Sequence, residues 1–239
     1  MSIQKKVIIV TGAGSGVGRA TALRFAQAGG RLALFGRTQE TLAATANAIH
    51  DASGEALVIA GDVAREEDVR TLFARVHEVY GRVDILINCA GMVAVKSFLE
   101  MDSATWDHVL NVNLRGTFLC CQQAFKAMAE QGKEGGVILN ISSLSGVKGV
   151  EKFPGLSAYN VSKAGVASLS EILAVEGKPL NIRVATVSPG AVDTEMLRKA
   201  APHLKAGMTP TELAEILLFL ADDSGRVLSG TNLEIFSNA

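Results

Sequence analysis

The sequence predicts an α/β protein with a doubly wound, mainly parallel sheet of seven strands flanked by helices. Short runs of β-branched and aliphatic residues alternate with longer segments of helical periodicity, and glycine or polar residues follow each short run. This regular alternation is typical of parallel sheets with right-handed crossovers. No linker, repeat or low-complexity stretch interrupts the 239 residues, so we expect a single domain over residues 1–239.

The first strand is expected at residues 6–10, where the run VIIV is too short for a helix and apolar enough to be covered on both faces. The turn TGAGSGVG follows it, and the helical segment RATALRFAQAGG comes next. Gly12, Gly16 and Gly18 would let the backbone approach a pyrophosphate, and the helix would direct its N–H groups at it. This context favours a phosphate site, with a purely structural tight turn as the alternative.

The alternation then repeats. Strands are expected at RLALF, EALVIA and VDILIN, and helices at TQETLAATANAIHDA, with Thr38 as N-cap, and at REEDVRTLFARVHEVYG. Ligands of a doubly wound sheet bind outside the carboxyl ends of its strands. We therefore expect Arg37, Asp62 and Asn88, which stand at the ends of these strands, to share one crevice with the glycine turn.

Arg37 indicates the type of dinucleotide. About 20 residues beyond such a glycine turn, an acidic residue is normal where the ribose carries no phosphate. Gly36 and the cation Arg37 stand at this place instead, and a cation suits a 2′-phosphate. NADP(H) is therefore favoured over NAD(H), although a solvated arginine in a loop would explain the residue as well.

The rest of the chain continues the pattern. A helix is expected from Asp102, a long helix is expected to open at Asn113, and Thr209 with Pro210 should begin the helix TELAEILLFLA. VILNI, NIRVATV and TNLEIF are the expected fifth, sixth and seventh strands, and LRKAAPHLKAGM is expected to be a short polar connection. The helices after Asn113 and at VASLSEILAV are apolar on more than one side, which predicts a subunit interface in a homo-oligomer, a dimer or tetramer.

Tyr159 and Lys163 are the candidate chemical centre. If Ser157 or a neighbour caps their helix, the two side chains lie on one face a turn apart. A phenol with a pKa of roughly 10 is a poor acid or base near neutral pH, and a nearby ammonium favours the phenolate. Ser143, at the end of the preceding apolar run, could hold a carbonyl oxygen while Tyr159 gives or takes the proton. Taken alone, a Tyr–Lys pair at this spacing is more often an amphipathic surface pair.

Composition excludes other classes of function. A net charge of −1 gives no electrostatic case for nucleic acid or an anionic membrane as partner. No apolar stretch approaches the ~18 residues of a membrane span, and MSIQKK has no signal-peptide pattern, so the expected compartment is the cytoplasm. Three cysteines in apolar surroundings and four scattered histidines predict neither disulfides nor a metal site.

In combination, the motifs resemble the short-chain dehydrogenase/reductase family. TGAGSGVG, NCAG, Asn113, Ser143, YNVSK and SPGAVDT stand in the family's order over essentially the whole chain. The resemblance implies a single Rossmann-fold domain and an NAD(P)-dependent oxidoreductase that interconverts a carbonyl and a secondary alcohol by hydride transfer. NADPH-dependent reduction of a small-molecule ketone is favoured, with 3-oxoacyl thioester reduction as the nearest specific activity. The alternative is a catalytically silent dinucleotide-binding regulatory or scaffold protein.

The resemblance also implies roles for single residues. Tyr159 would be the general acid or base, Lys163 would bind the nicotinamide ribose and lower the Tyr159 pKa, and Ser143 would hydrogen-bond the substrate oxygen. Asn113 would hold a water that links Lys163 to a proton relay. The implied cofactor-binding residues are Gly12, Ser15, Gly16, Val17 and Gly18 at the phosphates, Arg37, Asp62 and Val63 on the adenine side, Asn88 and Ala90 in the middle, Tyr159 and Lys163 at the ribose, and Val192 and Thr194 at the carboxamide.

The chain departs from the family's pattern in several places. Cys89 replaces the second asparagine of the usual NNAG, which puts a strand-stabilising hydrogen bond in doubt. VKGVEKFPG adds a few residues between Ser143 and Tyr159, the segment after Thr194 is short, and the chain ends in IFSNA where many relatives have a glycine pair. We therefore expect the mouth of the site to have an unusual shape.

Overall fold

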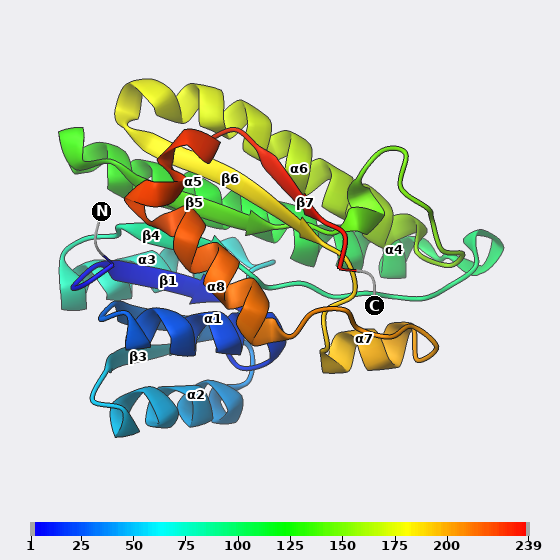
Figure 1. The fold of residues 1–239 in the computed structure, drawn as a ribbon, viewed down its shortest axis with the longest axis horizontal. Coiled ribbons are helices and arrows are strands. Elements are labelled where there is room, and N and C mark those ends of the chain that lie inside the picture. Colours follow the sequence, from blue (N-terminus) through cyan, green and yellow to red (C-terminus); the bar gives the residue numbers. More distant parts are fainter. Residues whose placement is uncertain (1–2, 238–239) are drawn as a thin grey trace.

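The computed structural model describes residues 3–237 as a single α/β domain (Figure 1). Its sheet has seven strands in the order β3-β2-β1-β4-β5-β6-β7, and all of their pairings are parallel. The predicted seven-stranded, doubly wound sheet is thereby confirmed. The strands are β1 (Val7–Thr11), β2 (Arg31–Gly36), β3 (Glu55–Ala60), β4 (Ile85–Asn88), β5 (Gly136–Ile141), β6 (Ile182–Pro189) and β7 (Asn232–Ile235).

Helices cover both faces of the sheet. The alternating side chains of β1 show why: Ile8 and Val10 pack in a buried cluster with α1, α2 and α8, whereas Val7 and Ile9 pack in a second cluster with α3 and α5. A strand buried on both faces needs apolar residues at every position, which is what VIIV provides. The helices are α1 (Gly16–Gln27), α2 (Gln39–Asp51), α3 (Glu66–Tyr80), α4 (Ser103–Leu110), α5 (Gly116–Glu130), α6 (Ser157–Gly177), α7 (Glu195–Ala200) and α8 (Pro210–Ala221).

The order of the strands reverses between β1 and β4. The chain passes from β1 outward to β2 and β3, then crosses back to β4 on the other side of β1. Loops that leave the carboxyl ends of β1 and β4 diverge at this point, and ligands of open α/β sheets bind there. Among residues 3–237, no helix is long and apolar enough to cross a membrane.

Two local predictions need correction. Asn113 does not open a helix: it lies in a π-helical turn, Asn111–Arg115, that joins α4 to α5 without a break. The Thr117 hydroxyl donates to the Asn113 carbonyl over 2.8 Å, which satisfies an oxygen within the widened turn. The segment 197–208 is not only a connection, because α7 extends into it. Thr194 begins α7 by accepting a hydrogen bond from Leu197 N.

Of the predicted caps at Thr38, Ser157 and Thr209, only Thr209 makes capping hydrogen bonds. Thr209 accepts from Glu212 N, and the Glu212 side chain accepts from Thr209 N, a complete capping box with Pro210 behind it. Thr38 occupies the N-cap position of α2, but its side chain makes no capping hydrogen bond. Ser157 is the first residue of α6 rather than its cap, and the N-cap is Leu156. The start of α6 is therefore set by the packing around it and not by a polar cap.

Candidate active site

A cavity of about 1310 Å³ lies at the carboxyl ends of the central strands. The glycine turn forms one wall through Gly12, Ser15, Gly16, Val17 and Gly18. The rest of the lining includes Ala90, Ser143, Tyr159, Lys163, Val192 and Thr194.

A smaller recess of about 180 Å³ is lined by Arg37, Asp62 and Val63. It shares Gly12 and Ala90 with the large cavity, so the two spaces adjoin at the glycine turn.

The glycine turn depends on the absence of side chains. Gly12 has φ +67°, and a Cβ built on it would lie 2.9 Å from the Ala90 Cα. A Cβ on Gly18 would lie 2.2 Å from the Gly12 carbonyl oxygen. The turn thus needs glycine both for its backbone conformation and for close packing of α1 on β1.

The first turn of α1 points its free N–H groups at this space. It contains no acidic residue, so nothing on the helix opposes a bound anion. These features fit the pyrophosphate of a dinucleotide.

The small recess fits the adenine end of such a molecule. Arg37 is exposed and makes no ion pair within residues 3–237, so its charge is available to a ligand. The Asp62 carboxylate accepts a hydrogen bond from Ala64 N over 2.9 Å, which fixes the loop after β3. Val63 is buried and forms an apolar floor.

Asn88 lies beside the cavity and not in its lining. Its Nδ2 donates to Asn140 Oδ1 over 2.8 Å, and Asn140 Nδ2 donates to Ser170 Oγ over 2.8 Å. This buried chain of hydrogen bonds joins β4, β5 and α6. The strand-stabilising contact that Cys89 put in doubt is thus made by its neighbour, while Cys89 lines the cavity as a neutral thiol whose pKa burial raises to about 12.

Tyr159 and Lys163 lie one turn apart on α6, and both line the cavity. Lys163 Nζ is 5.8 Å from the centre of the Tyr159 ring and donates to the Ile141 carbonyl over 2.8 Å. Burial lowers the pKa of Lys163 to about 8. Burial also raises the pKa of Tyr159, and a hydrogen bond with Ser143 offsets this only in part. Lys163 is not among the groups that shift the pKa of Tyr159 here, and the expected lowering by Lys163 stays a prediction.

Two serines fasten the end of β5 to the site. Ser143 faces the cavity, and its Oγ accepts a hydrogen bond from Ser145 N over 3.2 Å. Ser142 is buried, and its hydroxyl donates to the Lys163 carbonyl over 2.7 Å. The strand that delivers Ser143 is thereby tied to the helix that delivers Tyr159 and Lys163.

Asn113 is fully buried and lies behind the cavity. Its Oδ1 accepts from Met92 N over 2.8 Å, and its Nδ2 donates to Met92 O and to Ser162 Oγ, each over 2.9 Å. A Cβ on Gly91 would lie 3.5 Å from both Asn113 Oδ1 and Lys163 Nζ. Gly91 therefore leaves room between the two polar groups that any side chain would fill.

Val192 and Thr194 line the cavity, and Thr194 lies beside the glycine turn. A Cβ on Gly16 would lie 3.4 Å from Thr194 Cγ2. Val192 is buried and pairs with Met208 in an isolated bridge. The two residues thus place α7 over the mouth of the cavity.

Sequence reasoning missed much of the apolar lining. The available signal was the extra length between Ser143 and Tyr159, which indicated an unusual shape but not which side chains face inward. Val150, Phe153, Met196, Leu204 and Phe236 line the cavity away from the glycine turn. Within the described residues, no group of three or more histidine, cysteine or acidic side chains is arranged to hold a metal ion.

Comparison with known proteins gives a consistent result. The family described as short chain dehydrogenase matches residues 6–205. A 3beta-hydroxysteroid dehydrogenase of Mediterraneibacter gnavus is 31% identical over 259 residues, covering 95% of this chain and 92% of that protein. A 3-oxoacyl-(acyl-carrier-protein) reductase of Thermotoga maritima is 33% identical, covering 96% of each chain. The crystal structure of a short-chain type dehydrogenase/reductase from Mycobacterium marinum superposes with a TM-score of 0.92 at 33% identity, over 98% of this chain and 95% of that one.

Proposed function

The chain belongs to the short-chain dehydrogenase/reductase family of oxidoreductases, and we propose that it reduces the carbonyl group of a small ketone with NADPH. The observation that carries this proposal is the shared cavity: Ser143, Tyr159 and Lys163 line the same space as the glycine turn. A dinucleotide held by its phosphates at the turn would reach toward these side chains, which is the arrangement that hydride transfer to a carbonyl requires.

Each part of the cofactor has a fitting group in the chain. The glycine turn and the start of α1 would hold the pyrophosphate, Arg37 would pair with a 2′-phosphate, and Lys163 would bind the ribose next to the nicotinamide. Val192 and Thr194 would contact the carboxamide. The bound cofactor supplies the hydride; the side chains supply orientation and a proton.

Tyr159 is the proposed proton donor. Because burial holds its pKa above the ordinary value for a phenol, Tyr159 is protonated near neutral pH. A protonated phenol can donate to a carbonyl oxygen as that oxygen gains charge, whereas the reverse reaction would need the phenolate. Ser143 would hold the same oxygen with its hydroxyl. This state of Tyr159 suits the role of general acid in ketone reduction.

Lys163 and Asn113 would return the proton to Tyr159. The Lys163 ammonium has a lowered pKa of about 8, so it exchanges protons readily near neutral pH. The room left by Gly91 between Lys163 Nζ and Asn113 Oδ1 suits a water molecule, which needs two or more polar partners. We propose that this water links the buried lysine to the proton relay.

A panel of ketones and acyl thioesters, each assayed with NADPH and NADH, tests the proposed reduction and identifies the substrate. Oxidation of NADPH by a ketone or a 3-oxoacyl thioester is the expected result, and both the hydroxysteroid and the 3-oxoacyl relatives support such substrates. Absence of turnover with the whole panel and both cofactors would favour the alternative, a silent dinucleotide-binding regulator.

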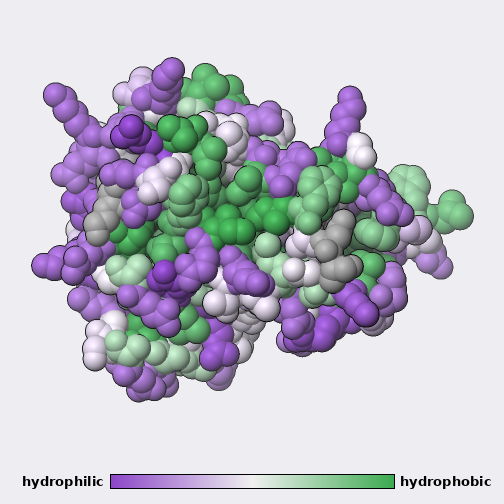
Figure 2. Space-filling view, in the orientation of Figure 1, coloured by the Kyte–Doolittle hydropathy of each residue, from purple (hydrophilic) through white to green (hydrophobic). Residues whose placement is uncertain are grey.

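We also propose a homo-oligomer, a dimer or a tetramer. Phe118 on α5 and Val161, Ile172 and Val175 on α6 are exposed, and Val175 exposes 68% of its surface. Figure 2 shows apolar residues gathered near the middle of the face that carries α8 and β7. Phe219 on α8 is half-exposed. Apolar helix faces of this kind are typical of subunit interfaces. A monomer by light scattering at micromolar concentration would contradict this.

A cytoplasmic location stays a prediction, which fractionation of producing cells would test.

A further inference from the structure

The segment 147–156, between Ser143 and the start of α6, is fixed at both ends. Lys152 Nζ donates to the carbonyl oxygens of Ser145 (2.7 Å), Leu144 (3.5 Å) and Val147. An ammonium has three N–H donors, and these three acceptors use them all. They belong to the short helical turn that follows Ser143, so Lys152 folds the inserted segment back onto that turn.

The other end of this segment is held by the loop after β4. Lys96 N donates to the Gly155 carbonyl over 3.0 Å. Gly155 has φ +83°, and a Cβ on it would lie 3.0 Å from Val95 Cγ1. The segment therefore needs a glycine at this position to approach its neighbour so closely. Two anchors, one at each end, make the segment a defined wall and not a loose loop.

This wall presents apolar side chains to the cavity. Val150, Phe153 and Leu156 line it on this side. The facing segments are apolar as well, and their lining residues are Val93, Val95, Met196, Leu197, Leu204 and Phe236.

Charged groups near the mouth do not form an anion site. Lys148 and Lys205 are exposed at the rim, as are Glu151, Glu195 and Glu234, so the two signs of charge are mixed. The Lys152 ammonium is occupied by backbone carbonyls and is not offered to a ligand. With about 1310 Å³ in total, the cavity exceeds the roughly 300–1,000 Å³ of an ordinary ligand site, which leaves space beyond a cofactor.

We propose that the segment 147–156 is the wall that recognises the substrate and that Lys152 is its positioning residue. The wall selects ketones and secondary alcohols that carry a bulky, uncharged apolar group over those that carry a carboxylate or phosphate. This inference rests on the proposed reductase function and adds the class of substrate. An apolar wall stabilises an apolar substituent that becomes buried against it and disfavours an anion that would lose its hydration there.

Two ketones that differ at one position test the substrate class. The purified enzyme with NADPH is assayed with 4-tert-butylcyclohexanone and with 4-oxocyclohexanecarboxylate, which share ring and carbonyl. We expect kcat/KM to be at least about tenfold higher for the tert-butyl compound. Equal values, or a preference for the carboxylate, would overturn this inference and leave the reductase function standing. No turnover of any ketone with NADPH or NADH would overturn both.

Lys152→Met tests the positioning role. We expect it to raise KM for 4-tert-butylcyclohexanone about tenfold at unchanged kcat and to affect unsubstituted cyclohexanone much less, so that the ratio of the two kcat/KM values falls. Lys152→Arg should restore most of the preference, because a guanidinium can still donate to the carbonyls. Equal loss with both ketones, or no loss with either, would refute the role.

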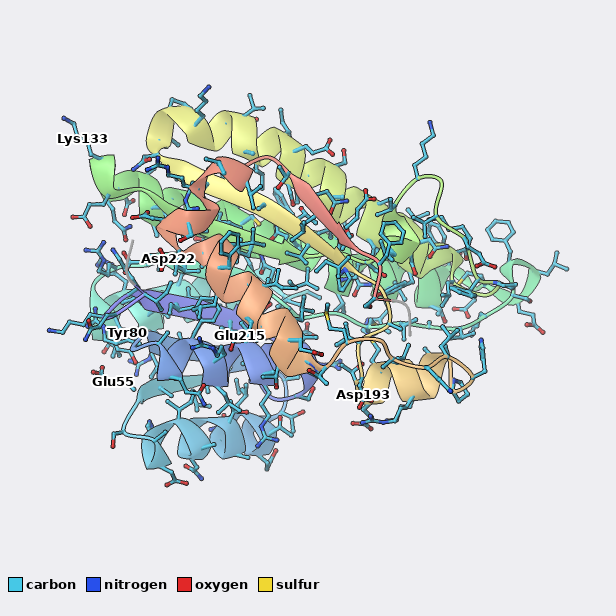
Figure 3. The ribbon with its side chains drawn as sticks, viewed as in Figure 1. Glu55, Tyr80, Lys133, Asp193, Glu215 and Asp222 are labelled. Atoms are coloured by element: carbon cyan, nitrogen blue, oxygen red, sulfur yellow. The ribbon has the colours of Figure 1, made fainter. Side chains whose placement is uncertain are left out.

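The matched control is Lys133→Met, which removes an exposed lysine at the opposite end of the molecule from Asp193 and α7 (Figure 3). It should leave both ketones unaffected. Phe153→Ala keeps the role of the wall testable if Lys152→Met fails to fold: it should lower kcat/KM for the tert-butyl compound more than kcat/KM for cyclohexanone. A preference that survives this change would also count against the wall.

Discussion

Lys163 and Ile141 are joined by a hydrogen bond of 2.8 Å, from the buried ammonium to the last carbonyl of β5. This contact fixes the lysine at the end of the strand that delivers Ser143, within 5.8 Å of the centre of the Tyr159 ring. The lysine is thus anchored before any cofactor binds. Its charge is costly to bury, and its lowered pKa reflects that cost.

The pKa of Lys163 predicts an alkaline limit to ketone reduction. Burial places this pKa at about 8, so the ammonium is present below that pH and is lost above it. Because reduction needs protonated Lys163 and Tyr159 to resupply the proton, kcat/KM should be level at acidic to neutral pH and fall above about 8. A pH profile of NADPH-dependent reduction measures this. A rate that stays level to pH 10 would show that the lysine proton is not required.

Tyr159→Phe should remove the proton donor and leave the shape of the cavity intact. General acid catalysis contributes typically about 10²–10⁴-fold, so kcat should fall by at least that range. NADPH affinity, measured by fluorescence, should change little because the hydroxyl is not part of the glycine turn. Near-normal turnover of this variant would refute the assigned role of Tyr159.

Arg37→Asp should exchange the preferred cofactor. A charge-assisted hydrogen bond contributes about 1.5–3 kcal/mol, so KM for NADPH should rise roughly 10- to 100-fold. The new carboxylate can accept from an unphosphorylated ribose, so KM for NADH should stay level or fall. Arg226→Asp, which changes an exposed arginine outside both cavities, serves as control. An unchanged ratio of the two KM values in Arg37→Asp would exclude the phosphate role.

The order of strands and helices could be predicted because the signal is local. Every residue of VIIV is apolar, and all of these positions in β1 are buried. The glycine turn was predictable for a similar reason, since its close approaches to Ala90 and within the turn itself tolerate no side chain. Local pattern therefore located both the sheet and its crevice.

The missed features depend on contacts between segments distant in sequence. The π-helical turn at Asn111–Arg115 accompanies the hydrogen bonds that Asn113 makes to Met92 and Ser162, and no periodicity reveals such partners. The Asn88 side chain lies outside the cavity lining because its Nδ2 donates to Asn140 Oδ1. No local pattern marks Lys152, since only the folded turn brings three carbonyls to one ammonium.

Asp84 should govern the stability of the protein in acid. It lies at the amino-terminal ends of the central strands β1 and β4, away from the site. Its buried carboxylate accepts from Val7 N over 2.9 Å and pairs with Lys6 (3.2 Å) and Arg82 (2.7 Å). Burial works to raise its pKa, but the hydrogen bonds from Arg82 and Val7 and the neighbouring charges together hold the pKa below the ordinary 3.8. A carboxylate with a lowered folded pKa stabilises the protein above its unfolded pKa, and this stability is lost as the pH falls from about 4 through the folded pKa.

Asp84→Asn should therefore lower the free energy of unfolding by about 1–3 kcal/mol at pH 7, because an amide cannot accept at both positions and leaves the cations unpaired. Thermal unfolding followed by circular dichroism measures this, with a fall in Tm of about 2–4 °C per kcal/mol for a chain of this size. The difference from the unchanged protein should shrink as the pH falls below about 4, since the unfolded chain there takes up a proton at Asp84 that the folded protein resists. Asp51→Asn, at the exposed end of α2, is the matched control and should change stability by less than about 0.5 kcal/mol. A Tm deficit of Asp84→Asn that is the same at pH 3 and pH 7 would mean that packing around residue 84, and not its charge, stabilises this end of the central strands.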